Sequence, residues 1–387
     1  PPLTSITPLH TSLCDLFQNT LDSDFCILSE DNIVSRLDLL GHAVYLSEQL
    51  PAKNYAINLC QDRYLFIVAY LAVYIRQQIS LLPSNQTPKT LTDLSVSYPD
   101  SYTIGDNKSS VDFYISHDLL AKSTSPCPHI DIDRPLSISF TSGSTGAPKA
   151  ITKTWREFQR SAELALQQLA LQNQNITLLS TVPMQHMYGL ETSFFWVLFS
   201  QMVLHNSRPF YPEDIRNTLA NLPVEKILVS TPRHLKSCSQ IQAHWSPIKF
   251  ILSSTAPMEP VLAEQIEQHL QAPLFELLGS TETLSFASHQ PSQTSQWQPY
   301  AGIQLQQHKG QFVLQGGHIA SPIILDDTFS IENNGNFSLL GRATDLIKIA
   351  GKRASLHNLN QQLTQINGIE DGVFFHSYNE RLSALVV

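Results

Sequence analysis

The sequence predicts an α/β protein: a large N-terminal body of parallel-sheet αβα sub-domains, a small β sub-domain, and the truncated start of a C-terminal α+β domain. Three observations support this fold class. Short aliphatic runs alternate with amphipathic helical stretches between residues 135 and 285, glycines punctuate short strand-like runs after residue 300, and a new unit begins near residue 343. Strands that alternate with helices of this length are joined by right-handed crossovers, which produce mostly parallel sheets.

The length of 387 residues accommodates two or three sub-domains of roughly 100–200 residues each. We expect an N-terminal body over 1–342 and the incomplete start of a C-terminal lid domain over 343–387. Within the body, the expected sub-domains are 1–130, 131–299 and 300–342. The sequence lacks an initiator Met and stops in a strand-like run without a turn, so we expect a trimmed segment of a longer chain.

The first strong element is an apolar run from Tyr64 to Ile75, bounded by Arg63 and Arg76. It is shorter than the ~20 residues that a membrane-spanning helix requires, so it predicts a buried helix and no membrane span. The expected strands of the parallel sheet are Leu136–Phe140, Ile176–Val182, Lys226–Val229, Ile248–Leu252 and Pro273–Leu277.

A helix is predicted after Thr154, because Thr154 and Glu157 have the spacing of a capping box. One face of this helix is apolar and should pack on the sheet; it consists of Phe158, Ala162, Ala165, Leu166 and Leu169. Ligands of such folds bind beyond the carboxyl ends of the strands, where this sequence places its polar, glycine-rich segments. After residue 300, the short strand-like runs predict a small antiparallel sheet or barrel.

Charge and cysteine content exclude several classes of function. Charged residues make up 15% and the formal net charge is −9, so a counterion-driven grip on nucleic acid is not expected. The cysteines show no CxxC or Cys/His ligand spacing, which argues against a disulfide framework and against a structural zinc site. A reducing cytoplasm fits this pattern best. The five cysteines are Cys14, Cys26, Cys60, Cys127 and Cys238.

The strongest local motif runs from Phe140 to Lys149, with the sequence FTSGSTGAPK. Its hydroxyl side chains, its glycine amides and its lysine offer many hydrogen-bond donors to a polyphosphate. It differs from the P-loop of NTPases because Pro148 separates Gly146 from Lys149. Taken alone, the motif is also compatible with an ordinary Ser/Gly turn that carries a solvated lysine.

Together with three further stretches, this motif resembles the acyl-adenylate-forming superfamily, which includes acyl-CoA synthetases, adenylation domains of non-ribosomal synthetases and firefly luciferase. Ser253–Pro257 followed by Glu276–Glu282 is similar to the adenine-lining segment and the E-x-Y-G-x-T-E signature. Asp327 lies fifteen residues before Arg342, the separation of the family's ribose-binding aspartate. The stretch 341–353 is similar to the family's hinge region.

The resemblance implies ATP and Mg²⁺ as cofactors. Glu282 would bind Mg²⁺, Thr281 would contact the α-phosphate and Asp327 would accept hydrogen bonds from the ribose hydroxyls. The implied catalytic residues are Lys149, Thr281, Glu282 and His186. The implied nucleotide-binding residues are Thr141, Ser142, Gly143, Ser144, Thr145, Gly146, Ser254, Thr255, Ala256, Pro257, Leu278, Gly279, Asp327, Arg342, Lys348 and Gly351. For Glu282 and Asp327, the alternative is a solvated loop carboxylate.

His186 matches the segment in which a histidine or an aromatic ring lines the acid pocket of the family and gates the thiol; the alternative is a histidine that binds a backbone carbonyl. Amino-acid-activating relatives carry an Asp here, but no acidic residue occurs before Glu191. Because an unpaired buried ammonium is costly, an aryl, cinnamoyl-type or fatty acid fits better. Phe194 and Phe195, at helical spacing, are expected in the core.

The sequence departs from the family pattern at several positions. Leu278 replaces the usual tyrosine, which weakens contact with adenine by about 1 kcal/mol. Thr344 stands at the usually acidic hinge position, and the chain stops before the late lysine of the family's mobile C-terminal domain. The short stretch between Glu282 and Asp327 resembles compact ligases of aryl-polyene-like pathways, which load a carrier protein.

The implied activity is ATP-dependent adenylation of an aryl or acyl carboxylic acid, followed by transfer to a pantetheine thiol. The acceptor would be coenzyme A or an acyl carrier protein, and the sequence leaves both open. A rotation near Thr344 would switch between the two half-reactions, with Gly351 lining the thiol tunnel. The alternative is a non-catalytic nucleotide-binding scaffold that retains the fold; luciferase-like oxidation has no support in the sequence.

Overall fold

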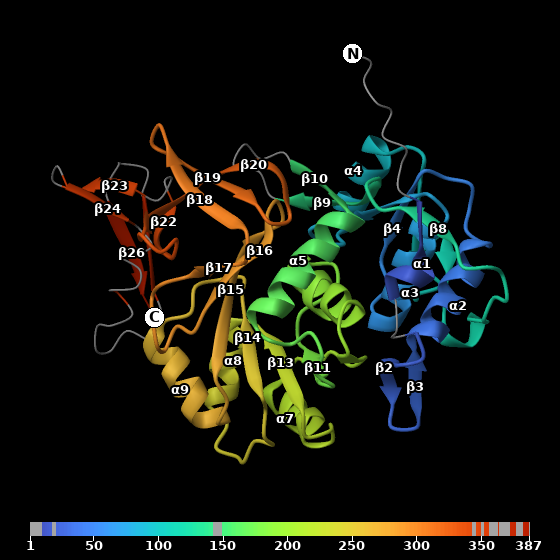
Figure 1. Cartoon of the computed structure of the whole chain (residues 1–387), viewed down its shortest axis with the longest axis horizontal. Coiled ribbons are helices and arrows are strands. Elements are labelled where there is room, and N and C mark those ends of the chain that lie inside the picture. Colours follow the sequence, from blue (N-terminus) through green and yellow to red (C-terminus); the bar gives the residue numbers. More distant parts are fainter. Residues whose placement is uncertain are drawn as a thin grey trace.

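The computed structural model describes residues 10–17, 21–141, 149–342, 346–349, 352–355, 363, 372–376 and 382–386. It has two large mixed sheets with helices between and outside them, and several small antiparallel sheets toward the C-terminus (Figure 1). The predicted α/β class with parallel sheets is therefore confirmed. The division of the chain at residue 342 stays a prediction.

The first large sheet has six strands in the order β10-β9-β5-β4-β6-β7. All neighbours in it are parallel except the pair β9 and β10. The strands are β4 (Tyr55–Asn58), β5 (Ile79–Leu82), β6 (Ser101–Gly105), β7 (Phe113–Tyr114), β9 (Pro135–Thr141) and β10 (Lys149–Thr154). The predicted strand at 136–140 thus belongs to a different sheet from the other predicted strands.

The second large sheet has nine strands in the order β17-β16-β15-β14-β13-β11-β12-β2-β3. Its central strands are parallel, and antiparallel pairs close both edges. The strands are β2 (Asp24–Ser29), β3 (Asn32–Ser35), β11 (Thr177–Ser180), β12 (Val203–His205), β13 (Lys226–Ser230), β14 (Phe250–Ser253), β15 (Leu274–Ser280), β16 (Leu284–His289) and β17 (Gln298–Pro299). Its four predicted strands are confirmed as β11, β13, β14 and β15.

Helices cover both faces of the nine-stranded sheet. In β13, Ile227 and Val229 belong to the main core, whereas Leu228 belongs to a second core under helices α7 (Pro212–Ala220), α8 (Pro232–Ser239) and α9 (Pro260–Leu270). Successive residues of a strand point to opposite faces, so this alternation shows that the sheet is buried on both sides. Burial on both sides explains why its strands read as continuous apolar runs.

The main core lies between the two large sheets and contains two predicted helices. The apolar run forms α3 (Arg63–Ile75), in which Arg63 through Tyr74 are all buried. The capping box is also confirmed at the start of α5 (Trp155–Gln168): the Thr154 hydroxyl accepts from the Glu157 amide, and the Glu157 carboxylate accepts from the Thr154 amide. No helix among the described residues is long and apolar enough to cross a membrane.

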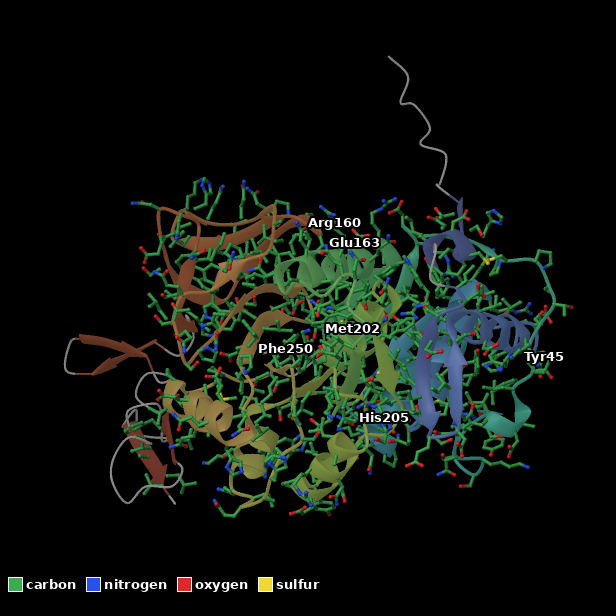
Figure 2. All side chains as sticks on the ribbon, turned by 60° about the horizontal axis from the view of Figure 1, so that its bottom comes forward. Tyr45, Arg160, Glu163, Met202, His205 and Phe250 are labelled. Atoms are coloured by element: carbon green, nitrogen blue, oxygen red, sulfur yellow. A yellow bond between two sulfur atoms is a disulfide. The ribbon has the colours of Figure 1, made fainter. Side chains whose placement is uncertain are left out.

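The apolar face of α5 packs against strand β16 and against the π-helix (Glu191–Trp196) that follows the short helix α6 (Met187–Leu190). The rings of Phe158 and Phe195 stack with centroids 4.2 Å apart, and Phe194 and Phe195 are fully buried as expected. On the opposite, exposed face, Arg160 pairs with Glu163 at 3.3 Å (Figure 2). The remaining helical segments are α1 (Leu13–Phe17), α2 (Arg36–Ser47), α4 (Pro88–Ser97) and a 3₁₀ turn (His117–Leu119).

The predicted antiparallel structure after residue 300 is confirmed. Strands β18 (Ile303–His308), β19 (Gln311–Gly316) and β20 (Ile319–Leu325) form one sheet, and β21 (Asp327–Ile331) pairs with β22 (Phe337–Arg342). Two further hairpins, β23 (Leu346–Ile349) with β24 (Lys352–Ser355) and β25 (Gly372–His376) with β26 (Leu382–Val386), follow near the C-terminus (Figure 1).

One expectation about cysteines is wrong. Strand β1 (His10–Ser12) pairs with β8 (His129–Asp131), and next to this pair Cys14 and Cys127 form a disulfide with their Cα atoms 6.0 Å apart. The two residues are separated by 113 positions, so only the tertiary pairing of β1 with β8 brings them together. Cys26, Cys60 and Cys238 are buried free thiols.

Candidate active site

A cavity of about 380 Å³ lies where β14 and β15 end, beside β21 and β22. Its size falls within the roughly 300–1,000 Å³ typical of small-molecule sites. It contains Ser254–Pro257, Leu278, Gly279 and Asp327, which the adenine and ribose motifs nominated. Its walls are Ser254, Thr255, Ala256, Pro257, Glu276, Leu277, Leu278, Gly279, Ser280, Trp297, Asp327, Leu339 and Gly341.

The parallel pairing of β14 with β15 explains why these separate motifs meet. Ser253 is registered with Glu276, so the loop that leaves β14 lies beside the end of β15. The Ser254 hydroxyl donates to the Leu277 carbonyl at 2.9 Å, and the Met258 amide donates to the Glu276 carboxylate at 3.0 Å. These bonds hold the loop against the strand and so shape one wall of the cavity.

The spacing between Asp327 and Arg342 has a simple structural origin. The two residues are directly opposite each other in the antiparallel pair β21–β22. Asp327 therefore reaches the cavity together with Gly341 from the facing strand. The side chain of Arg342 lies outside the described residues, as does that of Lys348, whose backbone pairs with Arg353 in the hairpin β23–β24.

Trp297 is a cavity residue that sequence reasoning missed. It is 5% exposed, lines the same cavity as Leu278, and stacks on His289 with ring centroids 3.8 Å apart. The Nε2 atom of His289 lies 2.8 Å from the Glu276 carboxylate, which fixes the imidazole behind the indole. Trp297 stands in a segment without a motif, so no local signal could have identified it. The indole ring of Trp297 gives this cavity an aromatic surface, which the aliphatic side chain of Leu278 cannot supply.

A second cavity of about 220 Å³ adjoins the first. Five residues, Ser254, Thr255, Leu277, Gly279 and Ser280, line both cavities and form their shared wall. The rest of the second cavity is lined by His186, Met187, Tyr188, Glu191, Thr281, Leu284 and Ser285. The structure thus brings together His186 and Thr281, two residues that the resemblance nominated.

His186 lies at the rim of this second cavity, exposed, at the residue that precedes α6. Partial desolvation lowers the pKa of its imidazole, and the positive charge of Arg208 lowers it further. Its imidazole is therefore neutral at neutral pH, in a position to accept a proton at the mouth of the cavity.

Glu191 is the acidic residue nearest to His186 in the sequence, and its carboxylate is 3% exposed. It accepts hydrogen bonds from the Ser161 hydroxyl at 2.7 Å and from the amide and hydroxyl of Ser285. Burial raises the pKa of Glu191, while these hydrogen bonds and the charge of Lys153 act in the opposite direction. Because the Glu191 carboxylate already accepts hydrogen bonds from Ser161 and Ser285, it is not placed to pair with an ammonium group of a substrate.

Lys149 and Glu282 form an ion pair next to Thr281, which lines the second cavity. The Lys149 Nζ atom lies 3.6 Å from the Glu282 Oε1 atom, with the lysine exposed and the glutamate partly buried. An ion pair this exposed to solvent contributes little to stability. The lysine can therefore leave the glutamate to bind a phosphate, and the glutamate can leave the lysine to bind a metal ion. No group of three or more His, Cys, Asp or Glu side chains suited to a metal occurs among the described residues.

Several residues that the motifs nominated cannot be placed. Thr141 ends β9 directly opposite Lys149, at the edge of the predicted phosphate loop. The loop itself lies outside the described residues, which leaves Ser142, Gly143, Ser144, Thr145 and Gly146 as predictions. Gly351 and the hinge residue Thr344 lie outside them as well.

Two joined cavities thus lie at the carboxyl ends of parallel strands in an α/β fold. Asp327 lines the first cavity, and Thr281, next to the Lys149–Glu282 pair, lines the second. The sequence profile of the AMP-binding enzyme family matches residues 37–308. The chain belongs to the AMP-binding enzyme family, which confirms the resemblance drawn from its motifs.

A curated relative matches part of the sequence, and solved structures share the fold. VraA of Staphylococcus aureus, named as a candidate long chain fatty acid-CoA ligase, is 24% identical over 275 residues, which cover 65% of this chain and 59% of VraA. The chain thus spans about three-fifths of that relative's length. ATP-bound MatB from Rhodopseudomonas palustris has a TM-score of 0.82, 14% identity and coverage of 97% and 88%. O-succinylbenzoate Coenzyme A Synthetase (MenE) from Bacillus subtilis, in complex with AMP, has a TM-score of 0.81, 18% identity and coverage of 96% and 87%.

Proposed function

We propose that this chain uses ATP to adenylate an aryl or acyl carboxylic acid and then transfers the acyl group to a pantetheine thiol. The observation that carries the proposal is the wall of five residues shared by the nucleotide cavity and the second cavity. A nucleotide in the first cavity and an acid in the second would place the α-phosphate and the carboxylate next to each other at this wall. Holding two reactants in this way supplies much of the rate of such a reaction.

In the first step, a carboxylate oxygen of the acid attacks the α-phosphorus of ATP. The bond between the α-phosphorus and the oxygen that bridges to the β-phosphate breaks, and pyrophosphate leaves with that electron pair. Negative charge develops on the phosphate oxygens, so fixed donors and cations at this point lower the barrier. Lys149 and Thr281 are the described residues suited to this role.

The donor set beside Thr281 fits Mg²⁺. This ion takes one or two carboxylates together with phosphate oxygens and water, and Glu282 supplies one carboxylate beside the phosphate-binding lysine. Once bound, Mg²⁺ would neutralise charge on the phosphate oxygens. Glu282 would hold the ion, while Lys149 would turn from Glu282 to the phosphates.

In the second step, the sulfur of the pantetheine thiol attacks the acyl carbon of the adenylate, AMP leaves, and the thiol proton is released. The neutral imidazole of His186 at the rim can accept this proton. The names of relatives such as MenE support coenzyme A as the acceptor, and an acyl carrier protein remains the second candidate. A swing of a C-terminal unit about Thr344 stays part of this proposal.

The second cavity favours a small acid without an amino group. At about 220 Å³ it is smaller than the roughly 300 Å³ at which typical ligand pockets begin. Met187, Leu277 and Leu284 give it apolar walls, and the carboxylate of Glu191 is already hydrogen-bonded. An aryl or short-chain acid therefore fits better than an α-amino acid.

The competing candidate is a nucleotide-binding scaffold without activity. Leu278 in place of the family tyrosine favours it, whereas the preserved Lys149, Glu282 and Asp327 weigh against it. A cytoplasmic location also stays a prediction, and the disulfide between Cys14 and Cys127 weighs against it because disulfides persist mainly in oxidising compartments.

The test is ATP–pyrophosphate exchange by the full-length protein with Mg²⁺, across hydroxybenzoates, cinnamates, short and long fatty acids and amino acids. We expect one aryl or short acyl class to stimulate exchange. Product analysis with coenzyme A and with a phosphopantetheinylated carrier protein then identifies the acceptor. Glu282→Gln should abolish exchange while AMP binding persists.

The outcomes separate the two candidates. ATP binding without exchange for any acid would establish the scaffold. Full exchange by Glu282→Gln would overturn the assignment of the metal ligand while leaving the reaction in place.

A further inference from the structure

Two lysines on one face of strand β10 contact the same residue, Glu282. Lys149 and Lys153 are four residues apart, so their side chains leave the strand on the same side. Lys149 Nζ approaches the Glu282 carboxylate, whereas Lys153 Nζ donates to the Glu282 backbone carbonyl at 2.5 Å. Only the first contact is explained by phosphate or metal binding.

Lys153 differs from Lys149 in its surroundings. It is 5% exposed, and its ammonium group also donates to the Glu157 carboxylate at 2.9 Å. Glu157 in turn caps helix α5 through the Thr154 amide. A buried charge is costly unless it is paired and hydrogen-bonded, and Lys153 meets this condition by joining α5 to the segment that carries Glu282.

A second buried side chain contacts the next backbone carbonyl along the chain. His318 lies in the turn between β19 and β20, is 5% exposed, and its Nε2 atom lies 2.7 Å from the Thr283 carbonyl oxygen. A carbonyl only accepts, so Nε2 carries the proton and donates. Burial lowers the pKa of His318 to about 4, which keeps the imidazole neutral.

The segment between these contacts is the tight turn from β15 to β16, with Ser280 registered against Leu284. Inside it, the Ser280 amide donates to the Thr283 hydroxyl at 2.9 Å, and that hydroxyl donates to the Leu284 carbonyl at 2.8 Å. These bonds fix the two ends of the turn. The Glu282 and Thr283 carbonyls are held instead by Lys153 and His318.

We infer that Lys153 and His318 are positioning residues that clamp the Thr281–Glu282 turn at two successive backbone carbonyls. Lys153 ties the turn to the strand that leaves the phosphate loop, and His318 ties it to the small β sheet. This inference rests on the proposed function, because it assigns the clamp the task of setting Glu282 at the distance from Lys149 that a metal–phosphate site requires. Functional groups need such support from their neighbours to within a fraction of an ångström.

The test compares Lys153→Met and Lys153→Arg with the wild-type, full-length protein. In ATP–pyrophosphate exchange, Lys153→Met should raise the Mg²⁺ concentration for half-maximal rate and lower kcat by about 10- to 100-fold, the scale of a misplaced catalytic group. The KM for the acid should stay unchanged. Lys153→Arg keeps a buried cation and should recover part of both losses.

The chain offers matched controls for loss of stability alone. Lys226 is 2% exposed and donates to the Leu222 carbonyl at 3.3 Å, remote from both cavities. Lys226→Met should lower the melting temperature and leave the Mg²⁺ dependence unchanged. His269→Leu is the matched control for His318→Leu, because the Nε2 atom of His269 also lies close to a backbone carbonyl oxygen, that of Ile241 at 2.6 Å.

A readout other than activity distinguishes the failure of this inference from the failure of the proposed function. Calorimetry should show that Lys153→Met weakens binding of Mg·ATP but not of AMP, which lacks the metal-binding phosphates. A wild-type Mg²⁺ dependence in folded Lys153→Met and His318→Leu would overturn the clamp and leave the function intact. If Lys153→Met does not fold, the Mg²⁺ dependence of His318→Leu alone tests the clamp. If the wild type neither catalyses exchange nor binds ATP, the proposed adenylation function is refuted.

Discussion

Replacing Trp297 by leucine tests whether the cavity at the ends of β14 and β15 holds adenine. The indole lines this cavity and is backed by His289, so it offers a flat aromatic surface that Leu278 does not provide. A purine packed against it would gain stacking energy. Trp297→Leu removes this surface, whereas Trp297→Phe retains an aromatic ring.

The magnitude follows from aromatic pairing. Such pairs contribute about 0.5–1.5 kcal/mol beyond the buried area, which corresponds to roughly a 2- to 12-fold weaker Kd for AMP in Trp297→Leu. Trp297→Phe should lose less. Because the indole also packs on His289, Trp297→Leu should lower the free energy of unfolding by about 1–3 kcal/mol, so binding must be measured well below the melting temperature.

Tryptophan fluorescence provides the assay. The chain has four tryptophans, and neither cavity is lined by Trp155, Trp196 or Trp245. AMP should change the emission of the wild type, and Trp297→Leu should lose that change while calorimetry still detects binding. An unchanged fluorescence response and an unchanged Kd in Trp297→Leu would refute the stacking role.

Three further predictions follow from other contacts. Lys149→Met should reduce exchange by about 10- to 150-fold, because one charge-assisted contact of about 1.5–3 kcal/mol to the phosphates is lost, and unchanged exchange would exclude Lys149 from the site. Replacing Cys14 and Cys127 by serine should lower the free energy of unfolding by about 2–5 kcal/mol in urea titrations; no loss, together with two free thiols in the non-reduced wild type, would contradict the bridge. The pKa of His318 is lowered from 6.5 to about 4 in the folded protein, so the unfolded chain takes up the proton first as the pH falls. The contribution of His318 to stability is therefore fully present above pH 6.5 and is lost as the pH falls toward about 4. The melting temperature of His318→Leu should therefore fall less steeply than that of the wild type between pH 6.5 and about 4. The charged residues that act on this imidazole, Lys153, Glu157 and Arg160, are unchanged in that variant.

The parts of the site that sequence reasoning could predict are those written in local patterns. Apolar runs predicted the strands β11, β13, β14 and β15. The polar residues that follow these runs predicted that Ser254–Pro257 and Gly279 lie at the ends of the strands, where the cavity is found. The separation of Asp327 from Arg342 became the register of one hairpin. In each case a few neighbouring residues determine both the local conformation and its position at the end of a strand.

The remaining features depend on contacts between distant segments, which no local pattern records. Trp297 reaches the cavity through its pairing with Phe337, and His318 reaches Thr283 across 35 residues. The bond between Cys14 and Cys127 depends on the pairing of β1 with β8. Scattered cysteines therefore could not exclude a disulfide, because spacing says nothing about strands that meet from far apart.

The hairpin of β15 and β16 links all three parts of the site. It lines the first cavity at Leu278, carries Glu282 in its turn and lines the second cavity at Ser285. Ser285 binds the buried carboxylate of Glu191, which lies on a π-helical segment, a conformation common at functional sites. A substitution that enlarges the second cavity at Ser285 would therefore also loosen the strand that bears the Glu282 turn. If the proposed function holds, acid specificity and metal binding should change together in substitutions of Ser285. Substitutions of Met187, which lines the second cavity from α6, should alter acid specificity alone.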